Sequence, residues 1–388
     1  MRKARILVIT RNLPPLIGGM ERLIHQATLG LSEYADVTVI GPDGCAAQLP
    51  AHVNCHEVSQ KLAPFIVHSA ILARSIARKT SFDIVLGGSG LSVIGVLLAA
   101  SKSNAKSALF VHGLDLVVNN WVYQRVFVPL ICRADLLITN SSNTQNIALD
   151  KGANPSRVAI VNPGTAIPEN TQGNDYADFC RKHDIPFPRY IIFAGRMTDR
   201  KGLSHFLRDS FPKIIKAAPD VGLVVIGHEP SDSLNKRGEE SQVHNVVEDM
   251  QLRERIRFLG KLPDAALTDG FTHAAAHIFP LREVTGDVEG FGMVAVEAAS
   301  CGTPTVAFDV GGVADAVTIA NGHLVLAGDY NEFAKRVIDV VTHAKPSAAQ
   351  CRKFAAQFSW PLYNSKLRQL MHTLAPDKIV TAVQNESR

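Results

Sequence analysis

The 388-residue sequence lacks any apolar run approaching the roughly 20 residues that a membrane-spanning helix requires. At the N-terminus, MRKARILVIT combines basic residues with an apolar stretch, but Arg11 and Asn12 end that stretch before it reaches the length of a signal-peptide core. We interpret residues 6–10 as the first buried β-strand instead. These absences favour a cytoplasmic protein whose contact with a membrane, if there is one, is peripheral and on the inner face of the cytoplasmic membrane.

Cysteine-based frameworks are absent as well. The six cysteines form no Cys-x-x-Cys pair and show no metal-ligand spacing with histidine, which argues against a disulfide scaffold or a zinc site and is typical of reduced thiols. The first predicted strand is not followed by Gly-x-Gly-x-x-Gly, so the fingerprint of a nicotinamide dinucleotide site is missing.

Net charge is small, at +4, which argues against a dedicated nucleic-acid binder. The charge is uneven, because residues 1–170 hold 15 Lys and Arg against 10 Asp and Glu, whereas the remainder holds 25 against 26. A basic N-terminal half suits an anionic partner such as a phospholipid surface or a phosphorylated acceptor. Ordinary scatter of surface charge explains the same numbers, so both interpretations stay open.

Short β-branched runs alternate with amphipathic segments along the whole chain, which predicts parallel sheets covered by helices on both faces. The predicted strands are 6–10, 37–40, 83–86, 108–111, 136–139 and 158–161, then 190–194, 222–226, 257–259, 276–279, 305–308 and 322–326. A polar, turn-rich segment, 162–178, separates the two series. We therefore predict an α/β chain of two Rossmann-like, doubly wound domains, 1–168 and 169–357, followed by a helical segment, 358–388. Ligands of such folds bind beyond the carboxyl ends of the strands.

Two loops of the first half follow predicted strands and carry candidate ligand-binding residues. Gly18 and Gly19 stand where a helix begins, so their backbone can approach an anion closely. His112 lies just past a strand end, where its imidazole could donate to a sugar hydroxyl or a phosphate oxygen. A plain tight turn and a structural histidine are the alternatives, and we interpret Asp115 as the N-cap of the next helix.

The second half carries a more informative pair of loops. After strand 190–194 comes GRMTDRKG (195–202), whose Arg196 and Lys201 could converge on a diphosphate. Farther along, EGFGMVAVE (289–297) predicts a loop and then a helix that begins near Gly290, with Glu289 and Glu297 eight positions apart and sharing one helix face. Backbone amides at this helix start form an anion site, and two carboxylates beside it suit the hydroxyls of a nucleotide sugar.

Together these motifs resemble the family-four retaining glycosyltransferases with the GT-B fold, in which two Rossmann-like domains face a central cleft. The resemblance covers nearly the whole chain, and its most specific part is EGFGMVAVE followed by Cys301-Gly302-Thr303-Pro304. It implies that the helix after Phe358-Ser359-Trp360 crosses back to the first domain. It also implies a first domain that binds the acceptor and a second that binds a nucleoside-diphosphate sugar.

Residue roles are carried over on the matching motifs. Arg196 and Lys201 would bind the diphosphate, Glu297 the ribose and Glu289 the transferred sugar, with His112 beside the reacting sugar. The catalytic residues implied are His112, Arg196, Lys201 and Glu289. The donor-binding residues implied are Gly18, Gly19, Arg196, Lys201, Lys261, Leu262, Glu289, Gly290, Phe291, Gly292, Met293, Val294 and Glu297. No metal and no cofactor is expected, because cations and a helix terminus neutralise the leaving diphosphate.

Two features depart from the family pattern. Asn162-Pro163-Gly164 stands where many members have Pro-Asn-Gly, and the loop before Glu289 is lengthened by Val284-Thr285-Gly286-Asp287. We expect that loop to shape the sugar or acceptor pocket. Two rival functions stay open: a nucleotide-sugar epimerase of the same fold, and a non-catalytic nucleotide-sugar-binding partner subunit.

The sequence gives less direct evidence about the acceptor substrate. Residues 62–79 alternate apolar and basic side chains at helical spacing, as in a helix that lies on an anionic membrane, although a sheet-covering helix with a solvated basic edge is the more ordinary interpretation. The segment WVYQRVF (121–127) adds a candidate lipid-facing or acceptor-facing patch. We therefore expect a saccharide or lipid-linked saccharide acceptor in envelope-polysaccharide or lipopolysaccharide synthesis.

Overall fold

A computed structural model describes residues 2–168, 175–229 and 238–380. The chain divides into two compact units, one formed by Met1–Gly164 with Trp360–Arg388 and the other by Thr165–Ser359. The sequence placed the domain boundaries at 168/169 and 357/358, and part of its predicted linker, 169–174, lies outside the described residues. We describe each unit by itself.

Unit 1 is built on a seven-stranded sheet in the order β3-β2-β1-β4-β5-β6-β7, and every neighbouring pair that the structure describes is parallel. The strands are β1 Ala4–Ile9, β2 Ala35–Pro42, β3 Asn54–Val58, β4 Ile84–Gly87, β5 Lys106–Val111, β6 Leu136–Thr139 and β7 Val158–Ile160. The helices are α1 Gly19–Tyr34, η1 Ala46–Gln48, α2 Leu62–Lys79, η2 Gly90–Ser92, α3 Val93–Ser103, α4 Leu114–Val117, η3 Tyr123–Phe127, α5 Val128–Ile131, α6 Ser142–Asp150, η4 Pro155–Arg157 and α16 Trp360–Leu374.

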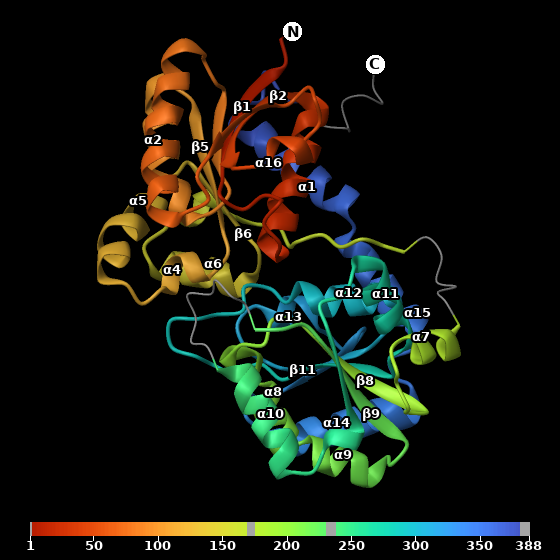
Figure 1. Cartoon of the computed structure of the whole chain (residues 1–388). Helices are drawn as coiled ribbons and strands as arrows, with labels where there is room; N and C mark the ends of the chain where they lie inside the picture. The colour runs from red at the N-terminus through yellow and green to blue at the C-terminus, as the bar shows by residue number, and fades with distance from the viewer. Residues whose placement is uncertain (1, 169–174, 230–237, 381–388) are drawn as a thin grey trace. The chain divides into compact units, whose positions relative to one another are not determined.

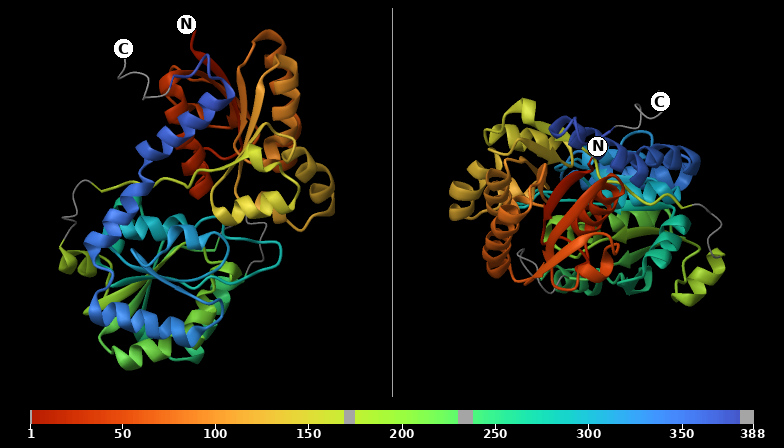
Figure 2. Two further views of the ribbon diagram at one scale, coloured as in Figure 1. Left: turned by 180° about the vertical axis from the view of Figure 1, so that it is seen from behind. Right: turned by 90° about the horizontal axis from the view of Figure 1, so that it is seen from above.

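Side chains that alternate along β1 enter different cores on the two faces of this sheet. Ile6 and Val8 pack with α1 and α16, whereas Leu7 and Ile9 pack with α2 and α3. Figures 1 and 2 show α1 and α16 on one side of the sheet and α2 on the other. The C-terminal helix α16 therefore completes the core of unit 1, as the sequence predicted.

Unit 2 repeats the arrangement with a six-stranded parallel sheet in the order β10-β9-β8-β11-β12-β13. Its strands are β8 Arg189–Ala194, β9 Val221–Ile226, β10 Ile256–Gly260, β11 Ala276–Phe279, β12 Thr305–Phe308 and β13 Gly322–Val325. Its helices are α7 Tyr176–Lys182, η5 Asp199–Lys201, α8 Leu203–Asp209, α9 Phe211–Ala217, α10 Glu239–Asp249, η6 Arg253–Arg255, α11 Asp264–His273, α12 Met293–Cys301, α13 Val313–Ala316, α14 Tyr330–His343, α15 Ala348–Ala355 and η7 Ala356–Phe358.

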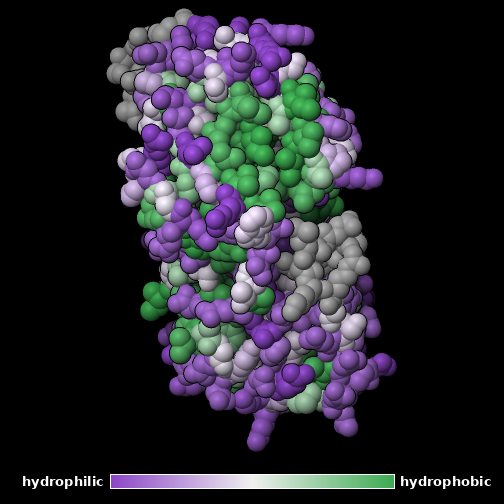
Figure 3. Space-filling model, turned by 90° about the vertical axis from the view of Figure 1, so that its left-hand side faces the viewer, coloured by the Kyte–Doolittle hydropathy of each residue, from purple (hydrophilic) through white to green (hydrophobic). Residues whose placement is uncertain are grey.

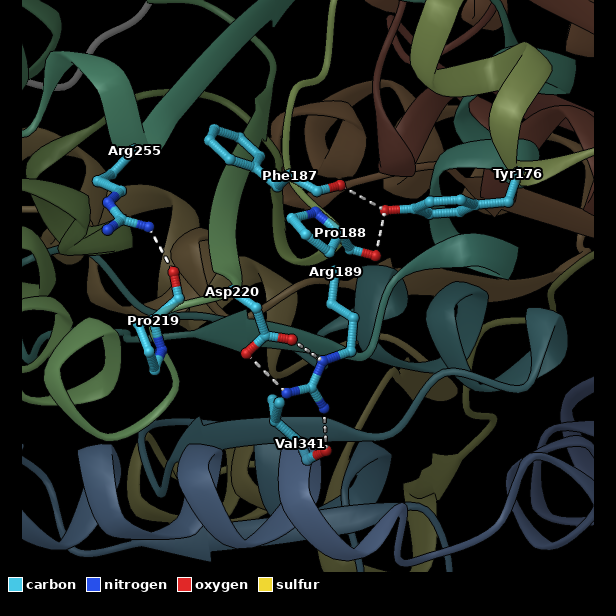
Figure 4. A network of polar contacts seen from close by, with 8 residues as sticks. All are labelled: Tyr176, Phe187, Pro188, Arg189, Pro219, Asp220, Arg255 and Val341. Atoms are coloured by element: carbon cyan, nitrogen blue, oxygen red, sulfur yellow. Dashed lines mark hydrogen bonds and ion pairs between the residues drawn. The ribbon is translucent and has the colours of Figure 1, made fainter.

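A polar network ties the amino ends of β8 and β9 to the surrounding helices (Figure 4). Arg189 makes a two-pronged pair with Asp220, with N···O distances of 2.6 and 2.9 Å, and donates to the carbonyl of Val341 on α14 at 2.9 Å. The hydroxyl of Tyr176 lies 2.9 Å from the Phe187 carbonyl oxygen, to which it donates. Because ligands of doubly wound sheets bind at the carboxyl ends, this network serves stability at the opposite edge.

Both predicted sheets are confirmed, and the α/β class of two Rossmann-like units with them. The sequence missed one strand, β3, and placed the start of α12 at Gly290, whereas the helix begins at Met293. No helix among the described residues is both long and apolar enough to span a bilayer.

Candidate active site

The carboxyl ends of β8 and β11 present two loops that are fastened to each other. The amide of Arg282, in the loop after β11, donates to the carbonyl oxygen of Arg200 at 2.8 Å, and the Arg282 guanidinium pairs with Asp199. Gly202 has a φ of +66°, and a Cβ there would collide with the carbonyl oxygen of Pro280. A glycine is therefore needed at this crossing, because a side chain would both strain the backbone and push the loops apart.

Four buried charges meet where these loops touch. Lys201 Nζ donates to Glu289 Oε2 at 2.6 Å, and the Arg200 guanidinium donates to the same oxygen through Nη1. Arg200 Nε lies 3.1 Å from Asp287 Oδ1. Each of the four side chains is at most 14% exposed. Two cations and two carboxylates thus form a cluster with no net charge. Such pairing offsets the cost of removing each charge from water.

The cluster shifts the pKa values of its members in opposite directions. Burial lowers the pKa of Lys201 to about 8, with Arg200 and Arg196 adding to the effect of burial and Glu289 opposing it. Burial would raise the pKa of Glu289, but Arg200 and Lys201 outweigh it and hold that pKa at about 2. Burial, with the charge of Lys201, lowers the pKa of His277 to about 3. The Glu289 carboxylate is therefore ionised at neutral pH, and the His277 imidazole is neutral.

The backbone of Glu289 is held from a third loop. Its carbonyl oxygen accepts the amide of Gly312 at 2.8 Å, and Gly311, with φ +63°, leaves no room for a Cβ beside that oxygen. Helix α12 begins four residues later, capped by Gly292 in the left-handed region. The first amides of such a helix have no intrahelical acceptor, so the predicted anion site at this helix start, close to Glu289 in sequence, stays a prediction with suitable chemistry.

The prediction that Glu289 and Glu297 share one face of this helix is wrong, because Glu289 precedes its first residue. Glu297 is on the helix and half-buried. Phe291 is buried and packs against Phe358, with ring centroids 5.6 Å apart, so it anchors the loop. Of the predicted donor-binding stretch, Gly290, Met293 and Val294 are half-buried and lie between Glu289 and the second turn of α12.

The two predicted phosphate-binding cations differ in environment. Lys201 is buried in the cluster, whereas Arg196 is exposed at the start of the same loop. Sequence reasoning missed Arg200 and Asp287. The signal for Arg200 was an arginine directly beside Lys201, and that for Asp287 was a carboxylate two positions before Glu289 in the lengthened loop. Past β10, Lys261 is exposed and Leu262 packs partly against the core around Phe179.

In unit 1, helix α1 begins at Gly19 with Gly18 as its N-cap, as expected for the Gly-Gly loop. His112 is buried, and its Nε2 lies 2.8 Å from the carbonyl oxygen of Gly88. A carbonyl only accepts, so Nε2 carries a proton and donates it to this carbonyl. The prediction that the His112 imidazole donates to a sugar hydroxyl or a phosphate oxygen stays a prediction, and it would fall to Nδ1, because Nε2 is engaged with Gly88. Asp115 is not the N-cap of α4, which is Gly113; it accepts the amide of His112 at 2.9 Å.

Comparison with known protein families gives a match within unit 2. Residues 179–358 match the family "Glycosyl transferases group 1", a span that holds Arg196, the four-charge cluster and helix α12. Among curated proteins, two D-inositol 3-phosphate glycosyltransferases of Catenulispora acidiphila are 27% and 30% identical, over 58% and 60% of this chain. The chain spans about half the length of these relatives, 53% and 55%.

A longer match extends to both units. The D-inositol 3-phosphate glycosyltransferase of Corynebacterium urealyticum is 26% identical over 95% of this chain and 96% of its own length. Among solved structures, Anabaena HepE in complex with UDP has a TM-score of 0.75 at 20% identity, covering 95% of this chain and 100% of that one. Sucrose-phosphate synthase from Thermosynechococcus elongatus has a TM-score of 0.78 at 19% identity, covering 97% and 100%. The resemblance read from the motifs is thus confirmed as a resemblance: residues 179–358 match the group 1 glycosyltransferases, and the two Rossmann-like units share the GT-B fold of the solved structures.

Proposed function

We propose that this protein transfers a hexose-type sugar from a nucleoside-diphosphate sugar to an acceptor hydroxyl. The observation that carries the proposal is the buried cluster of Lys201, Arg200 and Glu289, which lies at the strand ends inside the matched glycosyltransferase domain. A diphosphate needs cations and free amides, and a sugar needs hydrogen-bond acceptors for its hydroxyls. This loop pair offers both within one small region.

The roles follow from the chemistry of each group. Lys201 would exchange Glu289 for the donor diphosphate, with exposed Arg196 and the first amides of α12 as further donors. Glu289 would keep its pairing with Arg200 and accept from a hydroxyl of the sugar. A carboxylate held by two cations is a poor nucleophile. We therefore favour front-face attack with retention, in which the leaving phosphate takes the acceptor's proton. The roles of Gly18, Gly19, His112, Lys261, Leu262 and Glu297 remain predictions.

The substrates are proposed as classes. The donor is linked to UDP or GDP, and the acceptor is a saccharide or a lipid-linked saccharide in envelope-polysaccharide or lipopolysaccharide synthesis. The names of relatives support a phosphorylated or lipid-bearing acceptor, since one is a GDP-mannose-dependent mannosyltransferase of a phosphatidylinositol monomannoside from Corynebacterium glutamicum, 30% identical over 47% of this chain.

A donor screen tests the proposal. The protein is heated with UDP, GDP, UDP-glucose, UDP-galactose or GDP-mannose in buffer containing EDTA, because no metal is expected to be needed. A ligand at 100 times its Kd should stabilise the fold by about 2.7 kcal/mol. Release of nucleoside diphosphate that depends on acceptor would then establish transfer. Failure of every nucleotide and nucleotide sugar to shift the melting temperature would overturn the proposal.

Assays with the same protein and donors distinguish the two alternative functions. A nucleotide-sugar epimerase would convert the donor to its epimer without any acceptor, and product analysis by chromatography would reveal it. A non-catalytic partner subunit would bind the donor but release no diphosphate with any acceptor. The presence of both Lys201 and Glu289, paired and buried, favours an active enzyme over the latter.

Transfer should weaken above about pH 8. Lys201 must be protonated to stabilise the diphosphate, and its lowered pKa of about 8 means that the free enzyme loses this charge well below the usual lysine value of 10.5. We expect kcat/KM for the donor, which reports groups of the free enzyme, to be level between pH 6 and 7 and to fall about tenfold per pH unit beyond pH 8. A profile that stays level to pH 10 would contradict the assigned role.

We also propose that unit 1 attaches to an anionic membrane. Figure 3 shows apolar side chains gathered on the face of unit 1 that carries α2. The outer side of α2 exposes Val67 and Ile71, by 54% and 65%, and α3 exposes Leu98 by 40%. The same α2 buries Phe65 and Ala73 on the sheet, so it is both a sheet-covering helix and an apolar surface. An apolar patch of this kind on a soluble unit calls for a partner.

The charged residues around this face favour an anionic lipid surface as the partner. Helices α2 and α3 and residues 121–132 contain no Asp or Glu, but they carry five cations, Arg74, Arg78, Lys79, Lys102 and Arg125. Trp121 is 74% exposed in the last of these segments. Cations around an apolar patch suit anionic headgroups above acyl chains, whereas a second copy of the same basic face would be repelled.

Flotation with vesicles tests the attachment. The protein should rise with phosphatidylglycerol-containing vesicles and stay behind with phosphatidylcholine alone. The double variant Val67→Ser/Ile71→Ser should lose most of the floated fraction. Ile319→Ser, which changes an 89% exposed isoleucine of unit 2, should float like the wild type. Wild-type protein that remains at the bottom with both vesicle types, or a double variant that floats normally, would contradict this face as the attachment site.

A further inference from the structure

The lengthened loop before Glu289 ends in a tight turn whose role the proposed reaction leaves unexplained. The amide of Asp287 donates to the carbonyl of Val284 at 3.0 Å, and the two residues form an antiparallel bridge. Gly286 takes the positive φ, +79°, that closes such a turn. The turn presents the Asp287 carboxylate toward the inside of the cluster, where its side chain is only 10% exposed.

Arg200 is held on two sides as a result. Its Nε faces Asp287 and its Nη1 donates to Glu289, so the planar guanidinium is fixed by two carboxylates from one loop. Burial would lower the pKa of Arg200, but Glu289 and Asp287 outweigh it and raise that pKa, so the charge is retained. A guanidinium fixed in this way cannot swing toward an incoming phosphate, unlike the single amine of Lys201.

Both cations share one oxygen of Glu289. Arg200 and Lys201 each donate to Oε2. If Arg200 stays in place when Lys201 moves to the diphosphate, the carboxylate keeps its orientation, and Oε1, which neither cation uses, can accept from a sugar hydroxyl. If Arg200 were not anchored, it would follow Lys201 toward the phosphate, and Glu289 would lose both partners at the moment the sugar binds.

We propose that Asp287 is a positioning residue that anchors Arg200 and thereby orients Glu289 toward the sugar of the donor. The inference rests on the proposed function and assigns different parts of the donor to different residues of the cluster. Asp287 and Arg200 serve recognition of the transferred sugar, whereas Lys201 serves recognition of the diphosphate. Removing the anchor should therefore weaken binding of the sugar part and leave binding of the nucleotide part nearly intact.

Calorimetric titration separates the two parts. The Kd values of UDP and UDP-glucose, or of GDP and GDP-mannose, are compared for each variant, using the base that the wild type prefers. In Asp287→Asn the Kd of the nucleotide sugar should rise about tenfold or more, the effect of disturbing one polar contact to a charged group, while the Kd of UDP or GDP changes less than threefold. Asp287→Glu, which keeps the charge, should recover part of the loss.

Two further variants keep the test decisive. Arg200→Lys retains the charge but cannot reach two carboxylates at once, so it should show the same selective loss even if Asp287→Asn fails to fold. Asp199→Asn removes the pair with Arg282 that joins the same two loops, and a purely structural effect would appear there as well. We expect Asp199→Asn to keep the wild-type ratio of the two Kd values.

The outcomes are distinct. A wild type that binds neither nucleotide nor nucleotide sugar overturns the proposed function before any variant is made. A wild type that binds both, with Asp287→Asn and Arg200→Lys keeping its ratio of Kd values, overturns this inference alone. Equal weakening of both ligands in these variants would also overturn it, because that result would assign Asp287 to the general shape of the loop.

Discussion

Replacing Lys201 with alanine is expected to lower kcat by about 100-fold or more at saturating donor. Loss of one preorganised electrostatic donor aimed at developing charge typically has an effect of this size. Lys201 is the member of the cluster suited to that task, because it is a buried amine whose hydrogen bond to Glu289 can be exchanged for one to a phosphate. Its ammonium also lies 4.5 Å from the centroid of the Phe279 ring, which keeps it inside the fold.

The matched control is Lys213→Ala. Lys213 lies in the same unit, where its amine bonds the Asp209 carbonyl and the Asn331 side chain at the surface, both at 2.6 Å. Steady-state kinetics at saturating donor should show wild-type turnover for this variant. Wild-type turnover in Lys201→Ala itself would count against the whole assignment of the cluster to the diphosphate.

The second large effect concerns stability. Leu367→Ala, in α16, is expected to destabilise unit 1 by about 2–5 kcal/mol, since a fully buried leucine leaves a cavity behind. Leu367 is 1% exposed and packs in the core that α1 and β1 also line. Denaturant unfolding followed by circular dichroism measures the shift, read from the transition of unit 1 because two units need not unfold together.

Leu362→Ala is the control on the same helix. Leu362 is 47% exposed, so its truncation should change the unfolding free energy by no more than about 0.5 kcal/mol. Equal stability of Leu367→Ala and the wild type would mean that α16 is not docked on unit 1.

The sequence predicted most of the sheet strands because parallel strands buried on both faces read as continuous apolar runs. Strand β3, Asn54–Val58, escaped because it lies at the edge of its sheet and reads Asn-Cys-His-Glu-Val, with no such run. The start of α12 was placed too early because Gly290 and Gly292 both look like helix boundaries. In the structure Phe291 is buried between them, and that packing keeps the chain out of the helix until Met293.

Within the candidate site, spacing alone could pair Arg196 with Lys201, because both stand in one glycine-bounded loop. It could not show that Arg200 is the buried partner of Glu289, since that pair is 89 residues apart and depends on how two loops cross. Nor could it assign the ring nitrogens of His112. That assignment depends on a carbonyl 24 residues earlier, and hence on the register between β4 and β5.

The return of α16 to unit 1 has a consequence for how the chain is made. Tyr363, Leu367 and Met371 fill the core beside β1, yet they follow the last strand of that sheet by about 200 residues. At a synthesis rate of roughly 5–20 residues per second, about 10–40 s pass between synthesis of the last strand of this sheet and synthesis of the α16 side chains that complete its core. Unit 2, whose strands and helices are contiguous in sequence, can close during that interval. The unit that is synthesised first is thus the one whose core is completed last.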